Sequence, residues 1–339
     1  MGCSTACSTA LRQELRLSNF KLDHPEPTLF LGSEWQGEPF EGVKLWYVVY
    51  RWAWAVYHFS WWVVNVVSEG GIQAPIQRKA YHFIYLTNWA YFSIMIMNMV
   101  HACIISVSWL RYRRAANLPK RTTLSLKVLW ALQNIVFLPA LLITAAYWTV
   151  IYDPANPVTA LNAEVHIINS VYVIIDLWVV ASPLRILHFY IPLCFLFVYL
   201  VFTLVYWAAG GTTPEGETAI YSIVDWDNLT VTLPFVFCSA ALSPLMQVLW
   251  PGREVQGQGC VQGSGKMCVC VCVATVCVLQ GESFTLFLFR LLTLQVFLIL
   301  TLCSHTHMIL QLMTDVYLTL RDYGVPNRIY RKIRMFKTE

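Results

Sequence analysis

The chain has 339 residues, of which 57% are hydrophobic and only 12% are charged, and its net charge is +4. Soluble globular domains carry about 25% charged residues, so this deficit excludes an ordinary water-facing surface and predicts an integral membrane protein. The small net charge gives no argument for nucleic acid, and membrane lipids are the expected partners. The 11 cysteines form no CxxC pair and no Cys/His zinc spacing, so we expect no cofactor and no disulfide framework.

Residues 1–43 are mostly polar and are expected to form a cytoplasmic N-terminal tail. No apolar stretch follows Met1, which argues against a signal peptide. Gly2 and Cys3 suggest lipidation, but the myristoylation pattern requires Ser or Thr at position 6, where this chain has Ala6. The sequence is compatible with acylation at Gly2 or Cys3 and with an unmodified tail.

Six apolar stretches between residues 44 and 250 are long enough to cross a bilayer, which takes about 20 residues of helix. The sequence therefore predicts an all-α fold, a polytopic transmembrane helical bundle. The predicted spans are residues 45–67, 81–110, 124–152, 165–181, 186–209 and 231–250.

Basic residues predict the orientation, because Lys and Arg concentrate in short cytoplasmic loops. The loop after the second span holds the densest basic cluster, which consists of Arg111, Arg113, Arg114, Lys120, Arg121 and Lys127. With this loop and the N-terminus in the cytoplasm, residues 153–164 and 210–230 lie outside. The second of these loops contains a glycosylation sequon at Asn228. Arg78 and Lys79 would also lie outside, against the rule.

The last quarter of the chain departs from the bundle pattern. Residues 251–282 are rich in Gly and Gln and then alternate Cys with Val, as a translated TG repeat would. We interpret them as a gene-model insertion or a disordered segment, and metal binding by the thiols is the alternative. Residues 283–339 add a hydrophobic segment and a basic tail.

Each of the first four spans carries polar residues on one face. In the fourth span these residues fall within about a third of the helix circumference. Such a stripe is expected to face the protein interior, either as a hydrogen-bonded seam or as a reactive site. The residues are Arg51, His58, Asn65, Asn98, His101, Gln133, Asn134, His166, Asn169, Ser170 and Asp176.

Two of the polar positions suggest catalysis. Thr87 and His166 are expected in the same leaflet, each near the outer end of its span. A hydroxyl within reach of an imidazole makes a nucleophile and a general base, and Asn88 or Asn169 would donate to the oxyanion. The alternative for Thr87 is a hydrogen bond to its own helix backbone.

Three motifs in order resemble the rolling stone family over about residues 15–250. They are Phe-Ile-Tyr-Leu-Thr-Asn-Trp at 83–89, His-Ile-Ile-Asn-Ser at 166–170 and Ile-Tyr-Ser-Ile-Val-Asp-Trp at 220–226. The resemblance implies a multi-pass plasma-membrane protein, and the founding member of the family is linked to myoblast fusion in insects.

The chain also looks distantly similar to the androgen-induced membrane hydrolases, which cleave fatty acid esters of hydroxy fatty acids with an intramembrane Thr and a His. That resemblance implies that Thr87 and His166 are catalytic, although Asn88 stands where the hydrolases have an aromatic residue. The expected functions are therefore cell–cell fusion or adhesion, intramembrane hydrolysis of lipid esters, and small-molecule transport.

Overall fold

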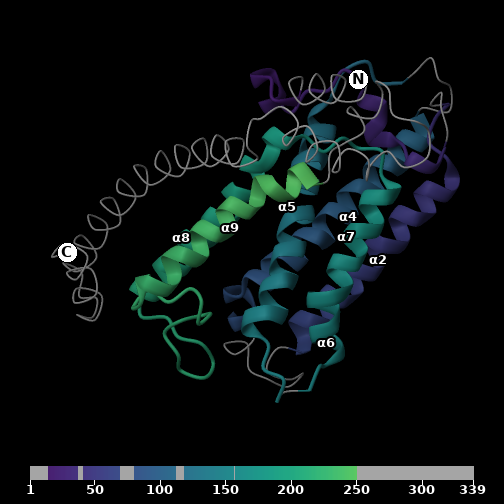
Figure 1. Ribbon diagram of the computed structural model, residues 1–339. Coiled ribbons are helices and arrows are strands. Elements are labelled where there is room, and N and C mark those ends of the chain that lie inside the picture. The colour runs from purple at the N-terminus through teal and green to yellow at the C-terminus, as the bar shows by residue number, and fades with distance from the viewer. Residues whose placement is uncertain (1–13, 37–40, 69–79, 112–117, 156, 250–339) are drawn as a thin grey trace, which may run out of the picture. The chain divides into compact units, whose positions relative to one another are not determined.

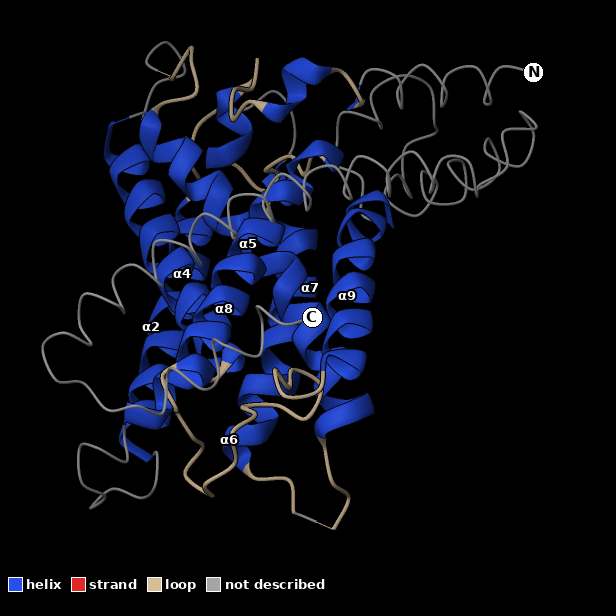
Figure 2. Cartoon of the chain, turned by 90° about the vertical axis from the view of Figure 1, so that its left-hand side faces the viewer, coloured by secondary structure: helices blue, strands red, loops and turns tan. Residues whose placement is uncertain are grey.

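The computed structural model describes residues 14–36, 41–68, 80–111, 118–155 and 157–249, and the side chains among them up to residue 241. Within these ranges the chain is built from helices and loops, with isolated β-bridges and no strand (Figure 2). The all-α prediction is therefore confirmed. The residues proposed for lipidation, Gly2 and Cys3, lie outside the described residues, as do the segments 251–282 and 283–339.

Helices occupy all six predicted stretches (Figure 1). The long ones are α2 (Leu45–Ser68), α4 (Leu86–Arg111), α5 (Leu124–Ala146), α7 (Asn169–Val179), α8 (Tyr190–Ala208) and α9 (Leu229–Leu249). The short elements are η1 (Leu17–Phe20), η2 (Pro27–Leu31), η3 (Glu34–Gln36), η4 (Ala80–Ile84), η6 (Tyr147–Ile151), α6 (Ala160–Ala163), η7 (Glu164–Ile168) and η8 (Ile186–Phe189).

Four helical stretches in the described part of the chain are long and apolar enough to cross a membrane: Leu86–Arg111, Leu124–Ile151, Ala160–Val179 and Ile186–Ala208. Helix α2 is also long, but its Trp, Tyr and His residues lower its hydropathy. The described apolar part of α9 is the shorter Leu229–Ala241. The chain is thus a multi-pass membrane protein, while the count of six spans stays a prediction.

The fourth span begins earlier than the sequence suggested. We expected it to start at residue 165, with Glu164 in the outer loop. Instead, Thr159 caps the helix by accepting a hydrogen bond from the backbone N–H of Asn162 at 3.1 Å. The helix then passes through the π-helical turn η7 into α7. Glu164 is therefore buried inside the helix.

Contacts between Cα atoms divide the chain into two compact units, and Tyr199 within α8 is the last residue of the first unit before Leu200–Ala241 of the second. In the first unit, α2 packs against α4, α4 against α5, and α5 against α7 (Figure 1). The core between these helices is apolar, and its residues include Ile94, Met97, Leu129, Phe137, Tyr172, Val173 and Leu177.

The described part of the N-terminal segment folds onto one end of this unit. Phe30 and Leu31 of η2 are buried with Trp130 of α5. The Ser33 hydroxyl donates to the carbonyl of Val179 at 2.6 Å. The Nζ atom of Lys127 lies 2.6 Å from Asp23 Oδ1, so this segment shares an end of the molecule with the predicted cytoplasmic loop.

In the second unit, the loop before α9 is held by indole donors. Trp207 Nε1 donates to Asp227 Oδ2 at 3.0 Å, and Trp226 Nε1 donates to Thr203 Oγ1 at 3.2 Å. Asn228 is exposed at the start of α9, and its Oδ1 accepts from the hydroxyl of Thr230 at 2.6 Å. The sequon is therefore accessible in this structure, and its glycosylation stays a prediction.

Candidate functional site

The polar faces predicted for the first four spans all point into the protein. Every residue of that set is buried, including Asp176 and Arg51, whose side chains are 0% exposed. Polar groups at membrane depth are stable only when they find partners inside the protein, and most of these residues do. Four of them, Arg51, His58, His101 and Asp176, belong to two clusters at different levels of α2.

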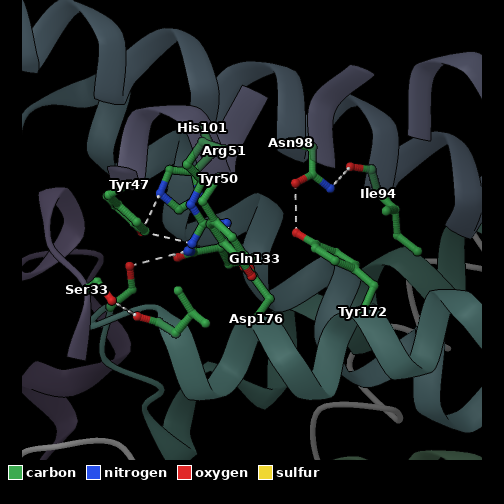
Figure 3. A network of polar contacts seen from close by, with 12 residues as sticks. Ser33, Tyr47, Tyr50, Arg51, Ile94, Asn98, His101, Gln133, Tyr172 and Asp176 are labelled. Atoms are coloured by element: carbon green, nitrogen blue, oxygen red, sulfur yellow. Dashed lines mark hydrogen bonds and ion pairs between the residues drawn. The ribbon is translucent and has the colours of Figure 1, made fainter. Parts of the chain in front are cut away.

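The first cluster is an ion pair between α2 and α7 (Figure 3). Arg51 Nη1 lies 2.6 Å from Asp176 Oδ1, and the Tyr50 hydroxyl donates to the same oxygen at 3.0 Å. Arg51 Nη2 donates to the hydroxyl of Tyr47 at 2.8 Å, which in turn lies 3.4 Å from His101 Nε2. A guanidinium and a carboxylate thus compensate each other inside a shell of tyrosines.

The second cluster surrounds Glu164 on η7, which is 2% exposed. Its Oε2 accepts from the hydroxyl of Tyr57 at 2.6 Å, and its Oε1 accepts from the hydroxyl of Tyr91 at 2.7 Å. His58 Nδ1 lies 3.2 Å from the same Tyr91 oxygen. We call Glu164, Tyr57, Tyr91 and His58 the Glu164 cluster. Among the described residues, Glu164 has no ion pair.

Sequence reasoning missed the Glu164 cluster, although it marked His58 as buried. Glu164 was placed in a loop because the apolar run starts after it. The signal that could have found it is Thr159, a good N-cap residue five positions earlier. Nothing in the sequence indicated that Tyr57 and Tyr91 would meet this carboxylate from α2 and α4.

The predicted catalytic pair is placed on two different helices. Thr87 lies in the first turn of α4 and is half-buried, while His166 is buried on η7. No hydrogen bond joins the two side chains in the described part of the chain. The His166 ring instead stacks on Tyr147, with centroids 3.5 Å apart and planes 3° apart. The catalytic role of Thr87 and His166 stays a prediction.

The two supporting asparagines lie within hydrogen-bond networks. Asn88 donates to the carbonyl of His82 at 2.7 Å and accepts from Asn65 at 3.0 Å. Asn169 donates to its own helix at the carbonyl of Val165 and accepts from the hydroxyl of Thr144 on α5 at 3.2 Å. Both side-chain amides therefore already donate and accept hydrogen bonds within the protein.

No group of three or more His, Cys, Asp or Glu residues able to hold a metal ion occurs among the described residues. The two clusters bring together hydroxyl, imidazole, guanidinium and carboxyl groups. Proton transfer, acyl transfer and structural hydrogen bonding are all within their range.

Comparisons with known proteins point to one family. The family model described as Protein rolling stone matches residues 4–249. A relative from Drosophila melanogaster named Protein rolling stone is 29% identical over 228 residues, which cover 65% of this chain and 79% of the relative. No solved structure matches the chain.

Proposed function

The chain belongs to the rolling stone family, and from that premise we propose that it acts in cell–cell fusion or adhesion, such as the fusion of myoblasts. In this proposal it resides in the plasma membrane with its N-terminus in the cytoplasm. The carrying observation is the family match over residues 4–249. The buried Arg51–Asp176 pair supports a structural role for the bundle, because it locks α2 to α7 rather than leaving a charge free for a substrate.

A cell-mixing assay tests this proposal. Two populations of fusion-competent cells carry different cytoplasmic fluorophores, and the full chain is expressed in one population or in both. We expect the wild-type chain to raise the fraction of doubly labelled cells above that of an empty vector. Arg51→Met should abolish the gain, while the exposed Lys44→Gln should retain it. A wild-type chain that reaches the cell surface without raising this fraction contradicts the proposal.

A second candidate function is the hydrolysis of lipid esters by Thr87 and His166. The observation in its favour is that His166 Nδ1 is buried without a hydrogen-bond partner, on a ring oriented by the stack with Tyr147. In this mechanism His166 takes the hydroxyl proton of Thr87, the Thr87 oxygen attacks the ester carbonyl, and Asn88 or Asn169 stabilises the oxyanion.

A covalent probe tests the esterase. The purified chain is incubated with a fluorescent fluorophosphonate, and we expect labelling that Thr87→Ala or His166→Ala abolishes. Thr149→Ala is the matched control, since the Thr149 hydroxyl only bonds its own helix at the carbonyl of Ala145. A folded wild-type chain that stays unlabelled removes the enzymatic function and leaves fusion or adhesion.

A further inference from the structure

The Glu164 cluster is a second buried charge site, and it differs from the first in having no cation among the residues that the structure describes. We propose that Glu164, Tyr91 and His58 form a proton-binding relay, in which one proton is shared between the carboxylate and the imidazole. The proposal concerns a site outside Thr87 and His166 and is independent of the proposed function.

Charge balance is the first argument. An ionised carboxylate buried at membrane depth is expensive unless a positive charge compensates it. Asp176 has Arg51 at 2.6 Å, whereas the partners of Glu164 in the described part of the chain are two hydroxyl donors at 2.6 Å and 2.7 Å. One added proton makes the Glu164 cluster neutral, which is the state that burial favours.

The direction of the hydrogen bonds is the second argument. A tyrosine hydroxyl has a single proton, and Tyr91 donates it to Glu164. The Tyr91 oxygen must then accept from His58 Nδ1, which lies 3.2 Å away. His58 Nε2 is buried without a hydrogen-bond partner. This nitrogen carries the second proton only when the imidazole is charged or has changed its tautomer.

Two coupled proton transfers, one on each side of the Tyr91 oxygen, carry a proton from His58 to Glu164. From imidazolium His58 and ionised Glu164, the Nδ1–H bond of His58 breaks as an O–H bond forms on Tyr91. The original O–H bond of Tyr91 breaks as an O–H bond forms on Glu164. The products are a neutral imidazole protonated on Nε2, an unchanged tyrosine and a neutral carboxylic acid. No external reactant is consumed, and the three groups are already within hydrogen-bond distance.

The described groups packed around the relay include no competing cation. Helix α2 contributes Tyr57 and α4 contributes Tyr91, while the ring of Tyr172 from α7 lies 4.6 Å from that of His58. Beyond them, η6 places Tyr147 against His166 on the same turn as Glu164. Arg51 lies about two turns of α2 away from His58, and it forms its ion pair with Asp176.

Glu164 lies near the start of its helix and in an irregular turn. Glu164 is the fifth residue of the stretch Ala160–Val179, about one turn from the helix start. It also lies in a π-helical turn, and such turns are frequent at functional sites because they leave backbone groups and side chains out of the regular register.

Infrared difference spectroscopy on the full chain in lipid nanodiscs tests the relay, with pH as the variable. We expect the wild type to show the C=O stretch of a buried carboxylic acid that appears as pH falls. Glu164→Gln should abolish this band, and the exposed Glu215→Gln should keep it. In the wild type, the carboxyl band and the signal of ¹⁵N-labelled His58 should change together as pH changes. Tyr91→Phe should keep a carboxyl band, but this band should then titrate independently of His58.

Two results overturn the proposal. One is a wild-type spectrum without a buried carboxyl band at any pH. This result does not depend on a variant that could fail to fold. The other is a band in which Glu164 and His58 titrate independently in the wild type, which would reduce the cluster to a static hydrogen-bonded seam.

Discussion

Single residues decide how the bundle tolerates charge. Arg51 and Asp176 are each 0% exposed, so removing either one leaves the other as an uncompensated buried charge. Lys44 Nζ and Glu41 Oε2 form another ion pair at 3.1 Å, but this pair is exposed to solvent. It adds little to the free energy of unfolding because water and salt screen it. A pair of opposite charges therefore matters far more at the buried position than at the exposed one.

Removing one partner of the buried pair should destabilise the chain more than removing both. Because Arg51 Nη1 lies 2.6 Å from Asp176 Oδ1, we expect Asp176→Asn to lose about 3–5 kcal/mol in the free energy of unfolding. Arg51→Met should lose a similar amount, and the double variant Arg51→Met/Asp176→Leu should recover most of it.

Denaturant unfolding in detergent, followed by Trp fluorescence, measures these changes in a double-mutant cycle. Lys44→Gln is the control, with an expected change of about 0–1 kcal/mol. If the losses of the two single variants simply add in the double variant, the pair is not coupled and this account of the cluster is wrong.

At the scale of helices, the sequence predicted those features that follow from the composition of a single segment. Apolar runs gave the helices, and the cost of polar groups in lipid gave the buried faces of α2, α4, α5 and α7. The partners across helices were not predictable, because Arg51 and Asp176 are 125 positions apart and periodicity on one helix carries no information about the helix it faces. The π-helical turns η6 and η7 likewise have no sequence pattern of their own.

Closing the π-helical turn η7 should dismantle the Glu164 cluster. Deletion of Ile167, a partly exposed residue of that turn, would restore α-helical register and rotate Glu164 by about 100° relative to α7. The two hydroxyl bonds to its carboxylate would be lost, at about 1.5–3 kcal/mol each.

Thermal unfolding of the deletion variant in nanodiscs should show a lower Tm than the wild type. Deletion of Ala155, an exposed residue in the loop before α6, is the matched control and should leave the Tm nearly unchanged. Equal Tm values for the two deletion variants would show that the π-helical geometry contributes nothing to stability.

At the scale of the whole molecule, the first unit has two distinct ends. The N-terminal segment lies at one end, where Lys127 pairs with Asp23 and the backbone N–H of His24 donates to Thr122 Oγ1 at 2.9 Å. The stretch Leu124–Ile151 has 28 residues and is about 42 Å long, which exceeds the roughly 30 Å of a bilayer core. This stretch is therefore long enough to bring the loop after it out on the opposite side of the membrane.

The basic loop at residues 111–127 should lie in the cytoplasm. Its exposed Lys120 and the exposed Ala155 mark the two ends of the same span, so single cysteines at these positions report opposite sides. In intact cells, a membrane-impermeant maleimide should label Ala155→Cys, and it should label Lys120→Cys only after permeabilisation. The wild-type chain, with its own 11 cysteines, sets the background.

The predicted orientation also puts Asn228 outside, so Asn228→Gln should remove any glycan detected by glycosidase treatment. Labelling of Lys120→Cys in intact cells, with Ala155→Cys protected, would invert the orientation and place the N-terminal segment outside.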